Sequence, residues 1–82
     1  MQVILSKEAQ KNYNHLPKVQ QIKIKKKITA LQENPYLGKK LEGELAGDRS
    51  LRAWPYRIIY SIDRKQKKVF VFSILHRQGA YN

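Results

Sequence analysis

The chain has 82 residues, no cysteine and a formal net charge of +11, from 17 lysines and arginines against 6 acidic residues. A chain of this length forms one small domain, residues 1–82, and without cysteine it has neither a disulfide framework nor a thiolate zinc site. Two well-separated histidines do not build a metal site either, so we expect the protein to bind no metal and no cofactor.

The first part of the sequence predicts a short strand and a short helix. The run QVIL, from Gln2 to Leu5, is typical of a strand, and Ser6 is a candidate N-cap for the helix that follows. Apolar residues then recur at spacings of three and four, which places them on one helix face. Pro17 ends this helix or begins the next, because proline is tolerated in a first helical turn.

A longer helix is expected from Lys18 to Asn34. Val19 and Ile22 are turned away from its other apolar residues, so we expect this helix to contact two surfaces, the sheet and the first helix. The run KIKKK, which includes Lys25 and Lys26, fits either a solvated helix face or a surface that follows a nucleic-acid backbone. Both interpretations stay open.

Three strands are predicted in the second half of the chain. Residues 33–48 hold Pro35 and three of the four glycines, so they are expected to form a connecting loop. The strands follow at Arg49 to Trp54, Tyr56 to Asp63, and Lys68 to Arg77. The last of them is apolar on both faces for most of its length, which is typical of a central strand covered on both sides.

These elements predict an α+β domain in the order β-α-α-β-β-β. The two-helix hairpin is expected to pack on one face of a small, twisted, mostly antiparallel sheet and to leave the opposite face free. Nowhere does an apolar stretch approach the ~20 residues that cross a bilayer, so the protein is expected to be cytoplasmic and to have no membrane partner.

The positive charge favours nucleic acid as a partner, with simple solubility or an acidic protein as alternatives. All five arginines fall between positions 49 and 77. Arginine grips phosphate with a rigid fork, whereas lysine is a mobile point charge. Arg57 and Arg77 are expected on neighbouring strands, with Arg52 one strand over, on the uncovered face. Their alternative role is to protect strand edges from aggregation.

The segment LEGELAGDRSLRAWPYRIIYSIDRKQKKVFVFSILHRQGAY, residues 41–81, resembles the RelE/ParE superfamily of toxin–antitoxin toxins. The later strands of that family read approximately as L-x-G, L-R, Y-R-I/V-x-Y and H-R-x-x-x-Y. The match covers about half of the chain directly, and the preceding strand and helical hairpin follow the family's order.

The resemblance implies a function and a set of partners. The RelE branch cleaves messenger RNA in the ribosomal decoding site without a metal, whereas the ParE branch inhibits DNA gyrase and generally lacks the nuclease residues. The RelE-like function is favoured here, and the gyrase inhibitor is the alternative. A cognate antitoxin is the implied protein partner, and any contact with operator DNA is expected only through the antitoxin.

Site residues follow from the same motifs. Arg57 of the Y-R motif and Arg77 of the H-R motif are expected to hold the phosphate, and Tyr81 to stack on a base or contact a 2′-hydroxyl. Arg52 matches the L-R position, whereas Trp54 is expected in the core or as a lid over the sheet. Further candidates for RNA binding are Arg49, Lys25 and Lys26.

The proton-transfer group is less clear from the motifs. The best-known member has two lysines just upstream, and their positions are occupied here by Asp48 and Ser50. His76 is the candidate instead, because it is the only side chain near the motif whose ordinary pKa lies close to neutral pH. Its alternative role is that of a core residue, alternating inward with Phe72 and Ile74.

Overall fold

The computed structural model describes residues 1–43 and 47–77. Its elements are β1 (Gln2–Leu5), α1 (Lys7–Asn14), α2 (Lys18–Glu33), β2 (Lys39–Lys40), β3 (Asp48–Ala53), β4 (Tyr56–Asp63) and β5 (Lys68–His76). The five strands form one sheet in the order β1-β5-β4-β3-β2, in which β1 pairs with β5 in parallel and the other neighbours are antiparallel. The predicted α+β architecture is confirmed.

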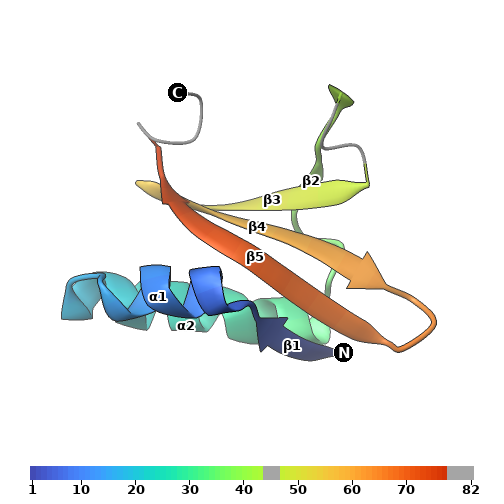
Figure 1. Ribbon diagram of the computed structural model, residues 1–82, viewed down its shortest axis with the longest axis horizontal. Helices are drawn as coiled ribbons and strands as arrows, with labels where there is room; N and C mark the ends of the chain where they lie inside the picture. Colours follow the sequence, from blue (N-terminus) through green and yellow to red (C-terminus); the bar gives the residue numbers. More distant parts are fainter. Residues whose placement is uncertain (44–46, 78–82) are drawn as a thin grey trace.

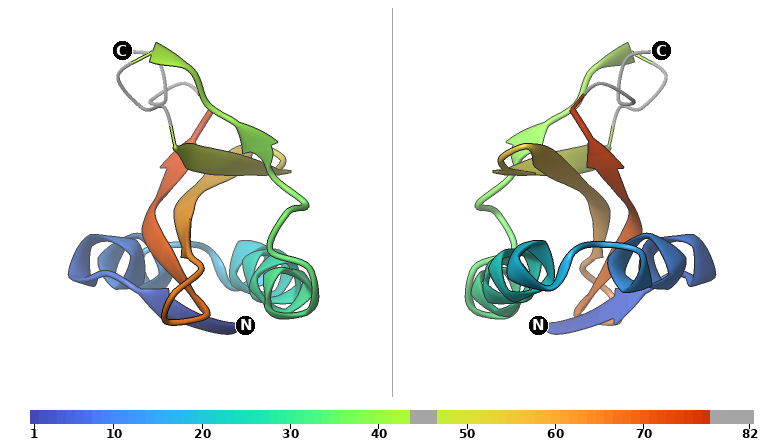
Figure 2. Two further views of the ribbon diagram at one scale, coloured as in Figure 1. Left: turned by 90° about the vertical axis from the view of Figure 1, so that its right-hand side faces the viewer. Right: turned by 90° about the vertical axis from the view of Figure 1, so that its left-hand side faces the viewer.

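The two helices lie on one side of the sheet, and no described helix covers the other side (Figure 1). Figure 2 shows the strong twist of the sheet, in which β3 runs across the direction of β5. The face opposite the helices, called the open face below, is therefore available for charged side chains. Within the described ranges no helix is long and apolar enough to cross a membrane.

Ser6 begins α1 in the way that the sequence predicts. The Ala9 amide donates a hydrogen bond to Ser6 Oγ at 3.0 Å, which satisfies one of the free donors of the first turn. The Ser6 hydroxyl donates in turn to the Phe72 carbonyl at 2.8 Å, and the Ser6 amide donates to the Val71 carbonyl at 2.9 Å. One residue thus ends β1, caps α1 and binds β5.

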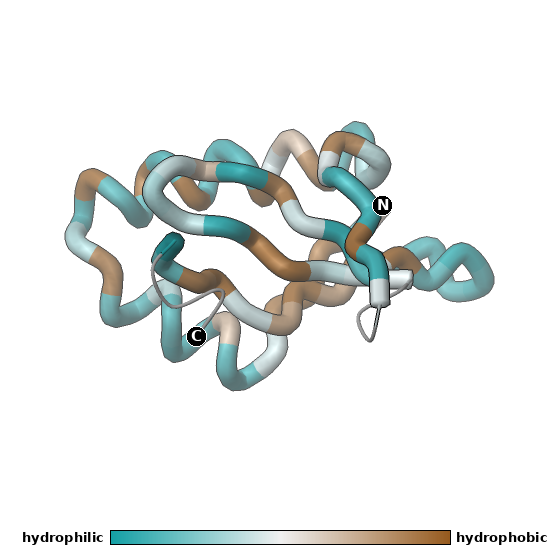
Figure 3. The backbone as a smooth tube through the Cα atoms, turned by 90° about the horizontal axis from the view of Figure 1, so that it is seen from above, coloured by the Kyte–Doolittle hydropathy of each residue, from teal (hydrophilic) through white to brown (hydrophobic). Residues whose placement is uncertain are grey.

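The core lies between the sheet and the helices. Its residues are at most 4% exposed and are Ala9, Ile24, Leu31, Ala53, Ile58, Tyr60, Val69, Val71 and Ile74. Figure 3 shows apolar residues placed at intervals along the elements, separated by polar ones. The helix α2 contacts both the sheet and α1 as expected. Val19 and Ile22 take no part in the core, however, because α1 packs mainly against β5 and leaves them 76% and 55% exposed.

The segment predicted as a loop contains a short edge strand. Lys39 and Lys40 of β2 pair antiparallel with Ser50 and Arg49 of β3. Two residues carry no periodicity, so only the partner strand reveals this element. The three later strands agree with the predicted bounds to within one residue at each end.

A β-bulge interrupts the pairing of β4 with β5. Tyr60 pairs with Val71, but the next residue back, Ile59, pairs with Ser73, so Phe72 is an extra residue without a register partner. As a result Val71 and Ile74 both face the core, although residues three apart in a regular strand point to opposite faces. The expectation that β5 is covered on both sides is wrong, because Phe72 is 42% exposed and the helices cover only one face.

Candidate nucleic-acid interface

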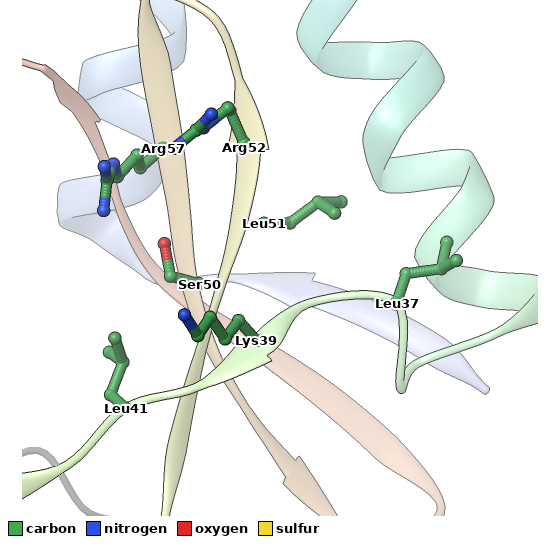
Figure 4. A pocket seen from close by; sticks show the side chains of 7 residues that line it. All are labelled: Leu37, Lys39, Leu41, Ser50, Leu51, Arg52 and Arg57. Atoms are coloured by element: carbon green, nitrogen blue, oxygen red, sulfur yellow. The ribbon is translucent and has the colours of Figure 1, made fainter.

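Arg52 and Arg57 meet across the β3–β4 hairpin. They are register partners, and directly opposed residues of antiparallel strands project from the same face. Ile58 is fully buried under the helices, so alternation along β4 places Arg57, and with it Arg52, on the open face. In Figure 4 the two side chains lie side by side. We call these two residues the arginine pair.

The arginine pair lines a hollow of about 310 Å³ at the β3 edge of the sheet. The other lining residues are Leu37, Lys39, Leu41, Ser50 and Leu51. Lys39 extends from β2 toward Ser50 (Figure 4), so this lining offers three cations and a hydroxyl but no carboxylate. Like charges placed opposite one another destabilise a sheet, and a bound anion such as a phosphate would lower the energy of this arrangement.

Arg77 is held at the same end of the sheet as the arginine pair. Its amide donates to the Pro55 carbonyl at 2.7 Å, and its guanidinium lies 4.7 Å from the centre of the Trp54 ring. Lys23 of α2 donates to the Trp54 carbonyl at 2.6 Å and so ties the β3–β4 turn to the helix. Trp54 is 52% exposed, so it is not a core residue but a support for Arg77. Leu75, which pairs with Arg57, is only two residues before Arg77, about 7 Å along the strand.

His76 lies at this end of the sheet but on the opposite face from Arg57. It pairs with Tyr56, and the two rings meet edge to face with centroids 5.3 Å apart at 88°. Because Tyr56 shares the helix side with Ile58, His76 shares it too. His76 therefore faces the helix side as Ile74 does, but it is exposed because it lies at the end of the strand. The expected alternation with Phe72 fails, because Phe72 is the bulge residue.

Arg49 is also separated from the arginine pair. It pairs with the buried Tyr60 and lies on the helix side of β3. Its Nη1 donates to the Gly38 carbonyl at 2.8 Å, and its guanidinium lies 5.0 Å from the centre of the Tyr36 ring. Arg49 and Arg52 are three residues apart, so alternation sends them to opposite faces.

The remaining predicted residues lie elsewhere. Lys25 and Lys26 are exposed on α2, where they line a hollow of about 420 Å³ with Ile22 and Thr29. Tyr81 lies outside the described residues. Among residues 1–43 and 47–77 no group of three or more His, Asp or Glu side chains is placed to hold a metal ion.

The buried Tyr60 has a role that the sequence analysis did not predict, because its hydroxyl holds the loop between α2 and β2. The hydroxyl donates to the Pro35 carbonyl at 2.7 Å and accepts from the Gly38 amide at 2.8 Å. Burial raises the pKa of Tyr60 above its ordinary value of 10.0, although the Gly38 hydrogen bond and the positive charge of Arg49 lower it in part. The loop between α2 and β2 is thus anchored on both sides of Tyr36. A buried tyrosine, which needs a hydroxyl partner, is the signal that could have revealed this anchor.

The sequence and the arrangement of the strands and helices agree with a known family. A family model described as the ParE toxin of the type II toxin–antitoxin system, parDE, matches residues 3–81. The chain belongs to this toxin family. It is accordingly the toxin component of a toxin–antitoxin module. No curated protein matches the chain.

Solved structures of related toxins share the fold. A chain of the toxin–antitoxin complex RelBE2 from Mycobacterium tuberculosis is 29% identical, with a TM-score of 0.86 over 93% of this toxin and 96% of that chain. The isolated Escherichia coli RelE toxin is 26% identical, with a TM-score of 0.78 over 92% and 82% of the two chains. A YoeB/ParE toxin from Agrobacterium tumefaciens, at 19% identity and a TM-score of 0.80 over 93% and 98%, shows the fold alone.

Proposed function

We propose that this toxin is a metal-independent endoribonuclease that cleaves messenger RNA on the ribosome. The observation that carries the proposal is the arginine pair, which places two guanidinium groups on one open face at the end of the sheet where Arg77 is held. Clustered forks of this kind suit the phosphates of an RNA strand.

The reaction is attack of a ribose 2′-oxygen on the adjacent phosphorus. The 2′-hydroxyl proton passes to a base, the bond from phosphorus to the 5′-oxygen breaks, and the leaving oxygen takes up a proton. The products are a 2′,3′-cyclic phosphate and a free 5′-hydroxyl. The transition state carries extra negative charge on the phosphoryl oxygens, and each fixed donor that stabilises it contributes about 3 kcal/mol.

The residues take different parts in this reaction. Half-buried Arg57 and the supported Arg77 hold the reacting phosphate, and exposed Arg52 binds the strand beside it. Tyr81, four residues beyond Arg77, contacts the ribose or stacks on a base. Proton transfer by His76 requires the RNA to pass around the end of the sheet, because the imidazole lies on the other face.

The proposal includes a cognate antitoxin as partner. Solved relatives of this fold from Mycobacterium tuberculosis, Escherichia coli and Pyrococcus horikoshii are RelB–RelE type complexes with their antitoxins. An acidic antitoxin segment would neutralise the +11 charge of this toxin and cover the exposed apolar residues of α2. Any contact with operator DNA is made through the antitoxin.

A second candidate is inhibition of DNA gyrase without cleavage of RNA. Two observations favour it: the matching family model is that of ParE toxins, and His76 is not on the face of the arginine pair. In that case Arg77 and Tyr81 are scaffold residues.

Primer extension on cellular messenger after induction of the toxin separates the two functions. Codon-phased 5′ ends support RNA cleavage, whereas accumulation of cleaved DNA supports gyrase as the target. Arg57→Ala, Arg77→Ala and Tyr81→Ala should each abolish the RNA ends, and Lys65→Ala, an exposed turn residue, is the matched control. If the three variants fold normally and still arrest growth, the nuclease function is lost.

A further inference from the structure

A second cluster of cations lies on the helix side of the sheet, away from the arginine pair. Tyr36, Lys40, Arg49 and Arg64 line a hollow of about 310 Å³, together with Gly47 and Ile62. We call the first four residues the tyrosine site. The guanidinium groups of Arg49 and Arg64 lie 5.0 and 5.9 Å from the centre of the Tyr36 ring. One aromatic ring therefore carries two cations.

The tyrosine site is held in place by the hydrogen bonds beneath it. Arg49 is fixed by its bond to the Gly38 carbonyl, and the Gly38 amide is bound to Tyr60. Gly38 packs so closely on Tyr60 that an added Cβ would lie 2.7 Å from Cε1 of the ring. The Tyr60 hydroxyl also holds Pro35, so the residues on both sides of Tyr36 are anchored. Little conformational entropy of these residues would therefore be lost when a ligand binds, because the hydrogen bonds already order them.

The chemistry of the lining selects an anion with an aromatic group. Among the described residues that line the hollow, three are cationic and none is acidic. Tyr36 is 45% exposed, so part of its ring stays accessible although the two guanidinium groups contact it. Phosphate for the cations and a base for the ring are the two parts of a nucleotide, and this combination is how proteins bind single-stranded nucleic acid.

The edge strand β2 connects the tyrosine site to the arginine pair. Successive residues of a strand point to opposite faces, and accordingly Lys39 lines the hollow of the arginine pair while Lys40 lines the tyrosine site. On β3 the two sites are three residues apart, about 10 Å. Each of the two sites thus has one lysine of β2 beside its arginines.

We propose that the tyrosine site binds single-stranded RNA, with a backbone phosphate on Lys40, Arg49 and Arg64 and a base stacked on Tyr36. The strand passes around β2 and continues to the arginine pair on the other face. The inference rests on the proposed function for the choice of RNA as the ligand, but binding at this site does not require cleavage.

Fluorescence anisotropy with a labelled 2′-O-methyl oligouridylate tests the site on the full chain, because this RNA has no 2′-hydroxyl to react. Arg64→Ala should weaken binding about fivefold and reduce the slope of log affinity against log salt by about 0.7, the value for one phosphate contact on a single strand. Lys65→Ala, the next residue of the same exposed turn, removes the same charge outside the site and should change affinity less than about twofold.

Tyr36 provides the second measurement. Tyr36→Leu should weaken binding about tenfold, whereas Tyr36→Phe should bind as the wild type does, because stacking needs the ring and not the hydroxyl. Equal affinities for Arg64→Ala and Lys65→Ala, or for Tyr36→Leu and Tyr36→Phe, overturn the inference. It is also overturned if the site variants weaken binding of the cognate antitoxin and leave RNA affinity unchanged.

The outcome is distinguishable from failure of the proposed function. If Arg64→Ala lowers RNA affinity as expected but the induced wild-type toxin yields no codon-phased RNA ends, the tyrosine site stands and the nuclease function falls. If Arg57→Ala abolishes cleavage while Arg64→Ala binds RNA as tightly as Lys65→Ala does, the nuclease function stands and the tyrosine site falls.

Discussion

The arginine pair and the tyrosine site each hold two arginines, on opposite faces of one sheet, but they differ in what lies between the cations. Arg52 and Arg57 oppose each other directly across two strands. Arg49 and Arg64 instead both lie close to the aromatic ring of Tyr36. The first arrangement concentrates charge and suits a transition state that gains negative charge, whereas the second spreads charge over a ring and suits binding.

The largest expected effect concerns the arginine pair alone. Arg57→Ala should slow RNA cleavage by about 10²-fold or more, because one donor to the developing charge is removed. Arg49→Ala should slow it less than about tenfold, since it acts on binding only. Primer extension in a translation extract measures both rates. The variant Arg57→Lys keeps the positive charge but lacks the planar guanidinium group that binds phosphate with two donors. If Arg57→Ala and Arg49→Ala slowed cleavage equally, the two faces would not differ in the roles proposed for them.

Loosening the tyrosine site from below should cost stability. Tyr60→Phe leaves the Gly38 amide and the Pro35 carbonyl without their buried partner and should lower the free energy of unfolding by about 2 kcal/mol. Urea denaturation measures the change. Tyr13→Phe is the control, because the Tyr13 hydroxyl makes no hydrogen bond within the described part of the chain. A Tyr60→Phe protein as stable as this control would contradict the anchoring role.

The same variant predicts a pH dependence. The pKa of Tyr60 is raised in the folded state above 10.0, so the folded protein holds the hydroxyl proton more tightly than the unfolded chain does. The stability that this contributes is fully present below pH 10.0 and is lost as pH rises through the folded-state pKa. The difference in unfolding free energy between wild type and Tyr60→Phe should therefore shrink above pH 10.0; a difference that grows there refutes the raised pKa.

A smaller effect is expected from the support of Arg77. Trp54→Leu removes the ring beneath the guanidinium and should slow cleavage about tenfold, since a misplaced group loses much of its effect on the reaction. Trp54→Phe keeps an aromatic face and should retain most of the rate. RNA affinity measured by anisotropy should change little in either variant, which separates the positioning of Arg77 from binding at the tyrosine site. If Trp54→Leu left the cleavage rate unchanged, Trp54 would not position Arg77 for the reaction.

The smallest effect is expected at Ser6, which binds β5 at the bulge. Ser6→Ala loses the N-cap and the bond to the Phe72 carbonyl and should lower stability by about 1 kcal/mol, or about 5 °C in Tm. Ser6→Thr keeps a hydroxyl and is the control. Thermal unfolding followed by circular dichroism measures both, and identical Tm values would show that neither bond stabilises the fold.

The strand β1 and both helices were predictable because their signals are local: the run QVIL for the strand, and a capping serine and spacings of three and four for the helices. The meeting of Arg52 with Arg57 followed from strands that neighbour in sequence. Residues far apart in the chain were less accessible. The edge strand β2 is defined only by its partner, and the cluster at Tyr36 brings together residues from a loop, β3 and the β4–β5 turn.

Periodicity left two placements open for His76, because the run VFVFSIL is mostly apolar in either phase, and the structure confirms the inward placement with Ile74 but not with Phe72. Only the pairing with β4 reveals where the phase changes. Trp54 was expected in the core or as a lid over the sheet, whereas its position in a turn next to Pro55 leaves the residue 52% exposed.

The bulge at Phe72 sets the register in which the end of β5 pairs with β4. If Phe72 instead paired regularly with Ile59 and no bulge formed, Arg57 would oppose Ile74, and His76 would turn to the side of the arginines. The exchange would bring an imidazole to the open face, where the arginine pair lies, and send Leu75 into the interior. The bulge thus decides whether the open face carries arginines alone or arginines together with a group able to move protons.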